Sequence, residues 1–303
     1  MRNEKAAAAA QRTVDRINAS KDRYVVYKTS RPITDLKDMI TSSAALYGDN
    51  IAFRQRFKKD EPYTSITYRQ ALADINALGT ALIGLGLQGK RIALIGENCY
   101  QWAMSYLAVV CGVGVVVPLD KELGTDAVAQ LCREAQVSAV IYTKKYAGMF
   151  AAIRASEATD IRTFINMNLE EDSAEELSHP SLVEKGRKLV ASGDRRFIDA
   201  QIDPEEMQIL LFTSGTTGIA KGVMLCHRNI CHDLMISPTI LNVNPWDIFF
   251  SVLPIHHTYE CTCGFLMPLY KGASIAYCEG LRYIQKNLKE VEPTMFLAVP
   301  LIF

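Results

Sequence analysis

The sequence lacks an excess of charge of either sign. Its 303 residues include 33 Lys and Arg against 33 Asp and Glu, so the formal net charge at pH 7 is zero. A balanced surface provides no strong field to attract nucleic acid or an anionic membrane, and any ligand must be recognised locally. Nucleic-acid binding is therefore not expected.

The sequence also lacks a hydrophobic run long enough to cross a membrane. The longest run, residues 106–119, is interrupted by Gly112, Gly114 and Pro118 and is shorter than the roughly 20 residues of a transmembrane helix. The alanines at residues 6–10 are too weakly apolar for the core of a signal peptide. We therefore expect a cytoplasmic protein whose residues 1–30 form a solvated lead helix.

Disulfide bonds are not expected either. Several of the eight cysteines lie within apolar segments, and a chain of this length can form a sizeable core without cross-links. A zinc site is an alternative use of these thiols, because four of them lie near four of the five histidines. That site would draw on Cys226, His227, Cys231, His232, His256, His257, Cys261 and Cys263. The absence of a Cys-x2-Cys pair weighs against it, so reduced thiols are the prediction.

Apolar periodicity indicates that strands and helices alternate. Thr67 and Gln70 have capping-box spacing and apolar residues then recur at helical intervals, which predicts a helix over residues 68–85. The same reasoning predicts strands at residues 91–95, 115–117, 139–142, 208–212, 248–252, 274–277 and 294–299, and helices at 100–110, 125–135, 229–236, 259–269 and 283–290. This alternation is typical of a parallel sheet covered by helices, so the predicted fold class is α/β.

A polar stretch between residues 168 and 204 marks the predicted domain boundary. It contains an acidic cluster that we interpret as solvated surface, namely Glu170, Glu171, Asp172, Glu175 and Glu176. We place an N-terminal extension at residues 1–30, a first α/β subdomain at 31–200 and a second at 201–303. The last residues, 298–303, are apolar and lack a polar ending, which predicts that the second subdomain is truncated.

One segment stands apart by its chemistry. The predicted strand at 208–212 is followed by Thr-Ser-Gly-Thr-Thr-Gly over residues 213–218. Lys221 comes three residues after the second glycine. Such a loop can turn backbone N–H groups and hydroxyls toward an anion, and its glycines allow close approach of a phosphate. The residues expected to bind phosphate are Thr213, Ser214, Gly215, Thr216, Thr217, Gly218 and Lys221.

A Walker A loop is the nearest alternative for this segment. It requires a glycine directly before the lysine and Ser or Thr directly after it, whereas Ala220 and Gly222 occupy these positions. Residues 223–225 also have the pattern of a strand and not of the helix that follows a Walker A loop. The interpretation as a P-loop NTPase therefore fails.

Residues 213–222 resemble the signature phosphate loop of the adenylate-forming enzymes, which include acyl-CoA synthetases, firefly luciferase and the adenylation domains of peptide synthetases. Residues 85–92 and residues 106–120, which end in Val-Pro-Leu-Asp, resemble the first two core motifs of that family. The resemblance covers residues 30–303. It implies the family's large N-terminal domain of two stacked αβαβα-type subdomains, with the second incomplete and the mobile C-terminal domain absent.

The resemblance implies a reaction in two steps. A carboxylate attacks the α-phosphate of ATP to form an acyl-adenylate and pyrophosphate, and a thiol, usually that of coenzyme A, then displaces AMP. Mg²⁺ is expected with the ATP, near Thr216 and Thr217. The family's catalytic lysine lies later than position 303, so we expect no catalytic residue in this chain and no turnover by the chain alone. A catalytically incomplete nucleotide- or acyl-binding module is the alternative.

The substrate side is carried by Leu-Pro-Ile-His-His-Thr-Tyr-Glu at residues 253–260. This segment resembles the family motif beside the carboxylate pocket, which implies pocket roles for His256, His257 and Tyr259. No Asp lies between residues 251 and 266 to pair with an amino group, so an amino-acid substrate is disfavoured. The segment looks most like that of the long-chain fatty acyl-CoA synthetases, which implies a fatty acid, ATP and coenzyme A as partners. Another class of carboxylate and peripheral contact with a membrane stay open.

Overall fold

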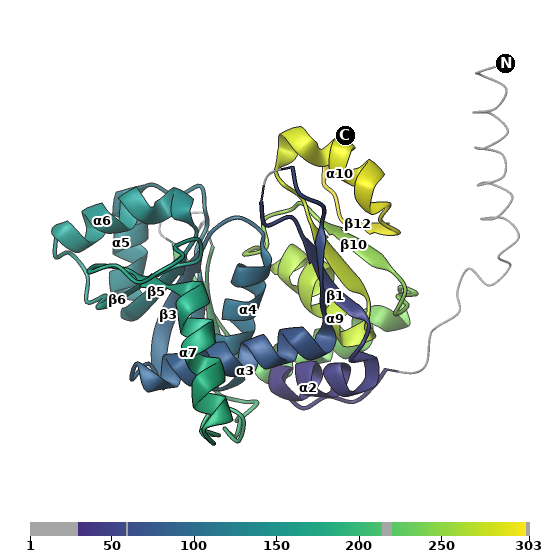
Figure 1. Ribbon diagram of the computed structural model, residues 1–303, viewed down its shortest axis with the longest axis horizontal. Coiled ribbons are helices and arrows are strands. Elements are labelled where there is room, and N and C mark those ends of the chain that lie inside the picture. The colour runs from purple at the N-terminus through teal and green to yellow at the C-terminus, as the bar shows by residue number, and fades with distance from the viewer. Residues whose placement is uncertain (1–29, 59, 214–219, 301–303) are drawn as a thin grey trace, which may run out of the picture.

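Two mainly parallel sheets with helices between them form the fold (Figure 1). The computed structural model describes residues 30–58, 60–213 and 220–300. The strand order is β7-β6-β5-β3-β4-β8-β9 in the seven-stranded sheet and β12-β10-β11-β1-β2 in the five-stranded sheet. The prediction of an α/β fold is therefore confirmed.

The strands are short, and neighbouring strands are parallel except in the pairs β8–β9 and β1–β2. The seven-stranded sheet contains β3 (Lys90–Ile95), β4 (Gly114–Pro118), β5 (Val137–Tyr142), β6 (Thr163–Asn166), β7 (Leu177–Ser178), β8 (Met207–Thr213) and β9 (Lys221–Cys226). The five-stranded sheet contains β1 (Ile51–Gln55), β2 (Thr64–Thr67), β10 (Ile248–Ser251), β11 (Ser274–Tyr277) and β12 (Met295–Phe296).

Most of the helices connect successive strands. The α-helices are α2 (Leu36–Tyr47), α3 (Tyr68–Gly84), α4 (Tyr100–Ala108), α5 (Thr125–Glu134), α6 (Ala147–Ala155), α7 (His179–Ala191), α8 (His227–Ile236), α9 (Met267–Lys271) and α10 (Ile284–Val291). Two π-helical segments, η1 (Val109–Val113) and η4 (Glu260–Leu266), follow α4 and precede α9. The predicted capping box of Thr67 and Gln70 is present at the start of α3.

Alternation along β3 explains how the seven-stranded sheet is covered on both faces. Successive side chains of a strand point to opposite faces. Ile92 and Leu94 are buried in a cluster with residues of α3 and α4, whereas Ala93 and Ile95 are buried in a cluster with residues of α5 and α6. A continuous apolar run of this kind is what a parallel strand buried on both faces requires.

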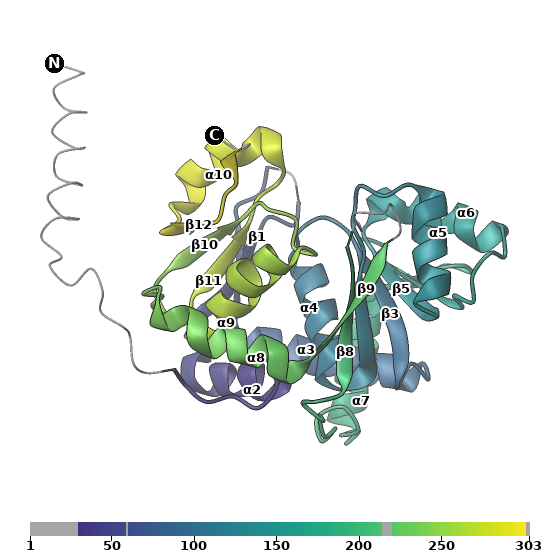
Figure 2. The same ribbon diagram turned by 180° about the vertical axis from the view of Figure 1, so that it is seen from behind.

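Helices α3 and α4 lie between the two sheets (Figure 2). Trp102 of α4 stacks on Tyr106, and its ring meets that of Phe265 in η4 edge-on at a centroid distance of 6.2 Å. Phe249 of β10 and Ile275 of β11 belong to the same buried cluster as α3 and α4. The apolar core therefore continues from one sheet to the other through this helical layer.

Membership of the sheets does not follow the order of the chain. Strand β1 pairs in parallel with β11, with Phe53 opposite Ile275, so an early segment completes the later sheet. Conversely, β8 and β9 follow the predicted boundary at residue 200 but belong to the seven-stranded sheet. The predicted lead helix at residues 1–30 lies, apart from its last residue, outside the described residues.

Three further expectations concern the acidic cluster, the cysteine thiols and a membrane-crossing segment. In the acidic cluster, Asp172 pairs with Lys185 and Glu175 pairs with Arg154, both at exposed positions. All eight cysteines are free, as predicted. Over residues 30–58, 60–213 and 220–300, no helix combines the length and the apolar character needed to cross a bilayer.

Candidate functional site

A cavity of about 550 Å³ lies beside the carboxyl ends of β4 and β8. Its lining comes from these strands, from α5 and from the turn after β10, and comprises Pro118, Asp120, Leu123, Ala127, Gln130, Leu131, Leu211, Phe212, Thr213, Ala220, His256, His257 and Thr258. Open α/β sheets bind ligands at the carboxyl ends of their strands. The cavity is therefore the candidate functional site.

The two ends of the predicted phosphate loop meet at this cavity. Thr213 is the last residue of β8 and lies opposite Lys221, the first residue of β9, in the antiparallel register of the two strands. Both side chains are exposed. The strand β9 directly after the loop agrees with the rejection of a Walker A loop, which would lead into a helix. The other predicted phosphate ligands, Ser214, Gly215, Thr216, Thr217 and Gly218, lie outside the described residues.

Two histidines and a carboxylate face one another in the cavity. His256 is 8% exposed, and its Nε2 lies 3.3 Å from Oδ1 of Asp120, which follows β4. The contact does not have the geometry of a hydrogen bond, and Nε2 has no hydrogen-bond partner among the described residues. Burial and the neighbouring ring of His257, 4.2 Å away between centroids, lower the pKa of His256 to about 4. Its imidazole is therefore neutral near pH 7.

Asn98 holds the turn that carries these histidines. Its Oδ1 accepts a hydrogen bond from the backbone N–H of Ile255 at 3.1 Å. Its Nδ2 donates to the carbonyl oxygen of Leu253 at 2.6 Å and to Oγ of Ser251 at 2.9 Å. One side chain before α4 thus fixes the path of the chain from β10 to the cavity.

After Thr258, which still lines the cavity, the chain turns away from it. Tyr259 is 52% exposed and is not among the residues that line the cavity. Glu260 is buried, and its Oε1 accepts a hydrogen bond of 2.6 Å from Oγ of Ser251. Burial raises the pKa of Glu260 to about 7. Of the three predicted pocket residues, the structure therefore places His256 and His257 at the cavity and Tyr259 outside it.

The alternative zinc site built on cysteines is not formed in the described residues. His227 has a structural role, since its Nδ1 accepts a hydrogen bond from the backbone N–H of Leu36 and its Nε2 lies 3.1 Å from the carbonyl oxygen of Val110. Both nitrogens of this buried ring are occupied. Within the described residues, the His, Cys, Asp and Glu side chains that come close enough to share a metal ion are Asp120, His256 and His257.

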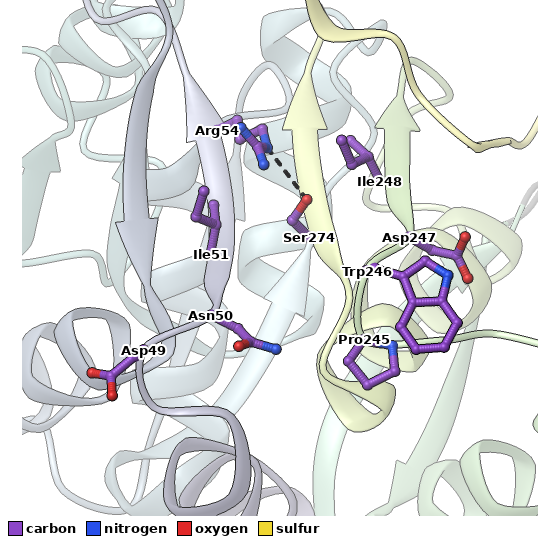
Figure 3. Close-up of a pocket in the computed structure, with 9 residues that line it drawn as sticks. All are labelled: Asp49, Asn50, Ile51, Arg54, Pro245, Trp246, Asp247, Ile248 and Ser274. Atoms are coloured by element: carbon purple, nitrogen blue, oxygen red, sulfur yellow. Dashed lines mark hydrogen bonds between the residues drawn. The ribbon is translucent and has the colours of Figure 1, made fainter.

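A second cavity, of about 400 Å³, lies at the amino ends of strands of the five-stranded sheet (Figure 3). Ile51, Ile248 and Ser274, which begin β1, β10 and β11, contribute to its lining. Arg54 also lines it and donates a hydrogen bond of 3.4 Å from Nε to Oγ of Ser274. This cavity contains none of the predicted site residues and lies at the amino ends of the strands, so we do not assign it the main function.

Several lining residues were not predicted as site residues. Ala127, Gln130 and Leu131 belong to α5, and their spacing of three and four residues places them on one face of that helix. Asp120 was identified only as the end of a motif. The sequence feature that could have identified it as a site residue is its position just after a parallel strand, where ligand-binding residues of α/β sheets are commonly found.

A cavity at the carboxyl ends of parallel strands is where α/β folds bind their ligands, and comparison with known proteins identifies the family. The model of the AMP-binding enzyme family matches residues 40–303, so this chain belongs to that family. Over 266 residues the chain is 29% identical to long-chain-fatty-acid–CoA ligase 1 of Cavia porcellus, a match that covers 80% of this chain and 36% of that protein.

Two further comparisons agree. The chain is 28% identical to the chloroplastic long-chain-fatty-acid–[acyl-carrier-protein] ligase AEE15 of Arabidopsis thaliana, over 88% of this chain and 38% of that protein. The crystal structure of the N-terminal domain of FACL13 from Mycobacterium tuberculosis superposes with a TM-score of 0.74 at 20% identity, over 89% of this chain and 64% of that one. The structural likeness confirms the fold of the N-terminal domain. The chain spans little more than a third of the length of these two sequence relatives.

Proposed function

We propose that this chain is part of a ligase that activates a long-chain fatty acid with ATP and transfers the acyl group from the acyl-adenylate to coenzyme A. Within that enzyme the chain supplies the phosphate loop and part of the acyl pocket. The observation that carries the proposal is the pairing of Thr213 with Lys221 beside the cavity. These residues are the last of β8 and the first of β9, on either side of the predicted phosphate loop.

The chemistry of adenylate formation fits these residues. A carboxylate oxygen bonds to the α-phosphorus of ATP while the bond from that phosphorus to the bridging oxygen of pyrophosphate breaks. Two anions approach each other, and negative charge grows on the departing pyrophosphate. A lysine ammonium and a hydroxyl placed beside that group stabilise the charge. In our proposal Lys221 and Thr213 have this role. Mg²⁺ stays a prediction, because Thr216 and Thr217 lie outside the described residues.

The apolar part of the cavity supports a fatty acid as the carboxylate. Leu123, Leu131, Leu211 and Phe212 line it, and each buried methylene of an acyl chain contributes about 0.8 kcal/mol to binding. The names of the relatives support the same substrate class, and one of them is an acyl-carrier-protein ligase. Coenzyme A is therefore our proposed acceptor, with an acyl carrier protein as the alternative. Cytoplasmic location and peripheral membrane contact stay predictions, since other relatives are named chloroplastic or peroxisomal.

Binding of ATP by the 303-residue chain tests the phosphate site directly. We expect Lys221→Ala to weaken ATP binding about tenfold or more, because the loss of a hydrogen bond to a charged group corresponds to roughly 1.5–3 kcal/mol. Lys289→Ala, which removes an exposed lysine on α10, is the matched control and should bind as the wild type does. Equal affinity of the Lys221 variant and the wild type would contradict the assignment.

Fatty-acid-dependent exchange of pyrophosphate into ATP tests the reaction. We expect exchange by a polypeptide that carries the complete enzyme and its loss in the Lys221→Ala form. ATP binding without exchange, under conditions where a known ligase of this family is active, would favour the second candidate, a binding module without turnover.

A further inference from the structure

Asp120, His256 and His257 come together from two different sheets. Asp120 follows β4 of the seven-stranded sheet, and the histidines follow β10 of the five-stranded sheet. One ligand atom of each side chain lies within 4.8 Å of the other two. Nothing in the local sequence around either segment requires this approach, and it is made by the tertiary fold alone.

The closest pair of atoms in this group has the spacing of two ligands on one metal ion. Nε2 of His256 and Oδ1 of Asp120 are 3.3 Å apart. With bonds of roughly 2.0–2.1 Å, neighbouring ligand atoms of a tetrahedral zinc ion are about 3.3 Å apart. The distance between these two atoms therefore matches such a site, and a ligand atom of His257 lies within 4.8 Å of both.

His256 provides an independent indication. Its side chain is 6% exposed, and its Nε2 lies 3.3 Å from the carboxylate of Asp120 without a hydrogen bond. A buried polar nitrogen without a partner is costly and normally has one in a folded protein. A metal ion bound to Nε2 would satisfy this atom, while Oδ1 of Asp120, which accepts a hydrogen bond of 2.9 Å from the backbone N–H of Glu122, keeps a further lone pair for the ion.

We propose that Asp120, His256 and His257 form a binding site for a divalent transition-metal ion of the zinc type. Two imidazole nitrogens and one carboxylate oxygen suit zinc, whereas Mg²⁺ prefers oxygen ligands, so this site differs from that of the Mg²⁺ expected with ATP. Three protein ligands leave a coordination position for water or for an oxygen of a ligand in the cavity. Occupancy also links the two sheets, since the ligands come from both.

Titration of the metal-free 303-residue chain with Co²⁺, followed by competition with Zn²⁺, tests the site. We expect one Co²⁺ per chain, with the visible absorption bands of a four-coordinate ion, displacement of Co²⁺ by Zn²⁺, and a higher Tm in the presence of Zn²⁺. We expect no near-ultraviolet band of sulfur-to-cobalt charge transfer, because no thiolate is a ligand. Absence of stoichiometric binding, or the appearance of that band, would overturn the proposal.

Variants assign the ligands. His257→Ala and Asp120→Asn change exposed or partly exposed side chains and should each weaken Co²⁺ binding about tenfold or more. His232→Ala, at an exposed histidine of α8, and Cys226→Ser are the matched controls and should leave binding unchanged. Equal loss in the controls would mean that scattered surface groups bind the ion, which contradicts the proposal. The assay contains neither ATP nor fatty acid, so its failure is distinct from failure of the proposed function.

Discussion

Oγ of Ser251 donates a hydrogen bond of 2.6 Å to Oε1 of Glu260, while Oε2 of the same carboxyl group has no hydrogen-bond partner among the described residues. Glu260 begins the π-helical segment η4 and is 1% exposed. A Cβ atom at Gly264 would lie 2.6 Å from the carboxyl carbon, so the glycine provides the space that the buried group occupies. The carboxyl is thus enclosed with one of its two oxygens unsatisfied.

Glu260 should make the stability of the fold depend on pH. Burial raises its pKa from 4.5 to about 7, so the folded state holds the proton more tightly than the unfolded state does. The resulting stabilisation is complete below about pH 4.5 and is lost as the pH rises to about 7, with a total change of roughly 3 kcal/mol. Urea unfolding of the wild type and of Glu260→Gln, at about pH 5 and about pH 8, measures it.

The glutamine variant keeps an oxygen that can accept from Ser251 but does not titrate. Its free energy of unfolding, relative to that of the wild type, should therefore increase between the two pH values. A difference between the two proteins that is the same at both would mean that the carboxyl is ionised in the folded state throughout this range.

Asn98 should control the geometry of the cavity from outside it. In Asn98→Ala the backbone groups of Leu253 and Ile255 lose their partners, and each buried group left unsatisfied costs roughly 1–3 kcal/mol. We expect lower stability in urea and weaker Co²⁺ binding, because the turn that carries His256 and His257 loses its support. Asn98→Asp keeps the acceptor for Ile255 but places a carboxylate oxygen against the carbonyl oxygen of Leu253, so it should also lower the stability. Unchanged urea stability in Asn98→Ala would contradict this role.

His227 should contribute to the stability of the fold and not to the binding of zinc. Its ring joins the backbone of Leu36, at the start of α2, to that of Val110 in η1. His227→Ala should lower the free energy of unfolding by roughly 1–3 kcal/mol through the unpaired backbone groups. His232→Ala, on the same helix but exposed, should change it by less than about 0.5 kcal/mol. Similar urea midpoints for the two variants would exclude a structural role for His227.

Local pattern was sufficient to predict most strands and helices around the site. The capping box at Thr67 and the apolar run of β3 contain their own signals, because a helix start and a buried strand depend on neighbouring residues. The strand predicted at residues 294–299 is shorter, with pairing limited to Met295 and Phe296 at the edge of the sheet. Residues 259–269 are helical as predicted, but the first part is the π-helix η4.

The pairing of strands that are far apart in the chain could not be predicted from local sequence patterns. The pairing of β1 with β11 joins segments far apart in the chain, and periodicity gives no information about such partners. The site likewise combines residues that a motif predicts with a residue that only the tertiary fold brings there. His256 and His257 were predicted from a motif, whereas Asp120 became a site residue only because the turns after β4 and β10 meet in space. Motifs identify residues with a chemical role, but the groups that face them depend on the fold.

The packing of α7 on α3 provides a test of the fold that is independent of any ligand. A Cβ atom at Gly186 of α7 would lie 1.8 Å from the carbonyl oxygen of Ala77 in α3, so only glycine permits the observed contact. Gly186→Ala should force the helices apart and lower the free energy of unfolding by roughly 1–3 kcal/mol.

Gly148→Ala in α6 is the matched control for this substitution, because nothing lies within 4 Å of the added atom. Here the change should stabilise the protein by about 0.5 kcal/mol, since alanine loses less backbone entropy than glycine on forming a helix. The two substitutions are chemically identical and are expected to shift the urea midpoint in opposite directions. A urea midpoint of Gly186→Ala equal to or above that of the wild type would mean that α7 does not pack against α3 at this distance.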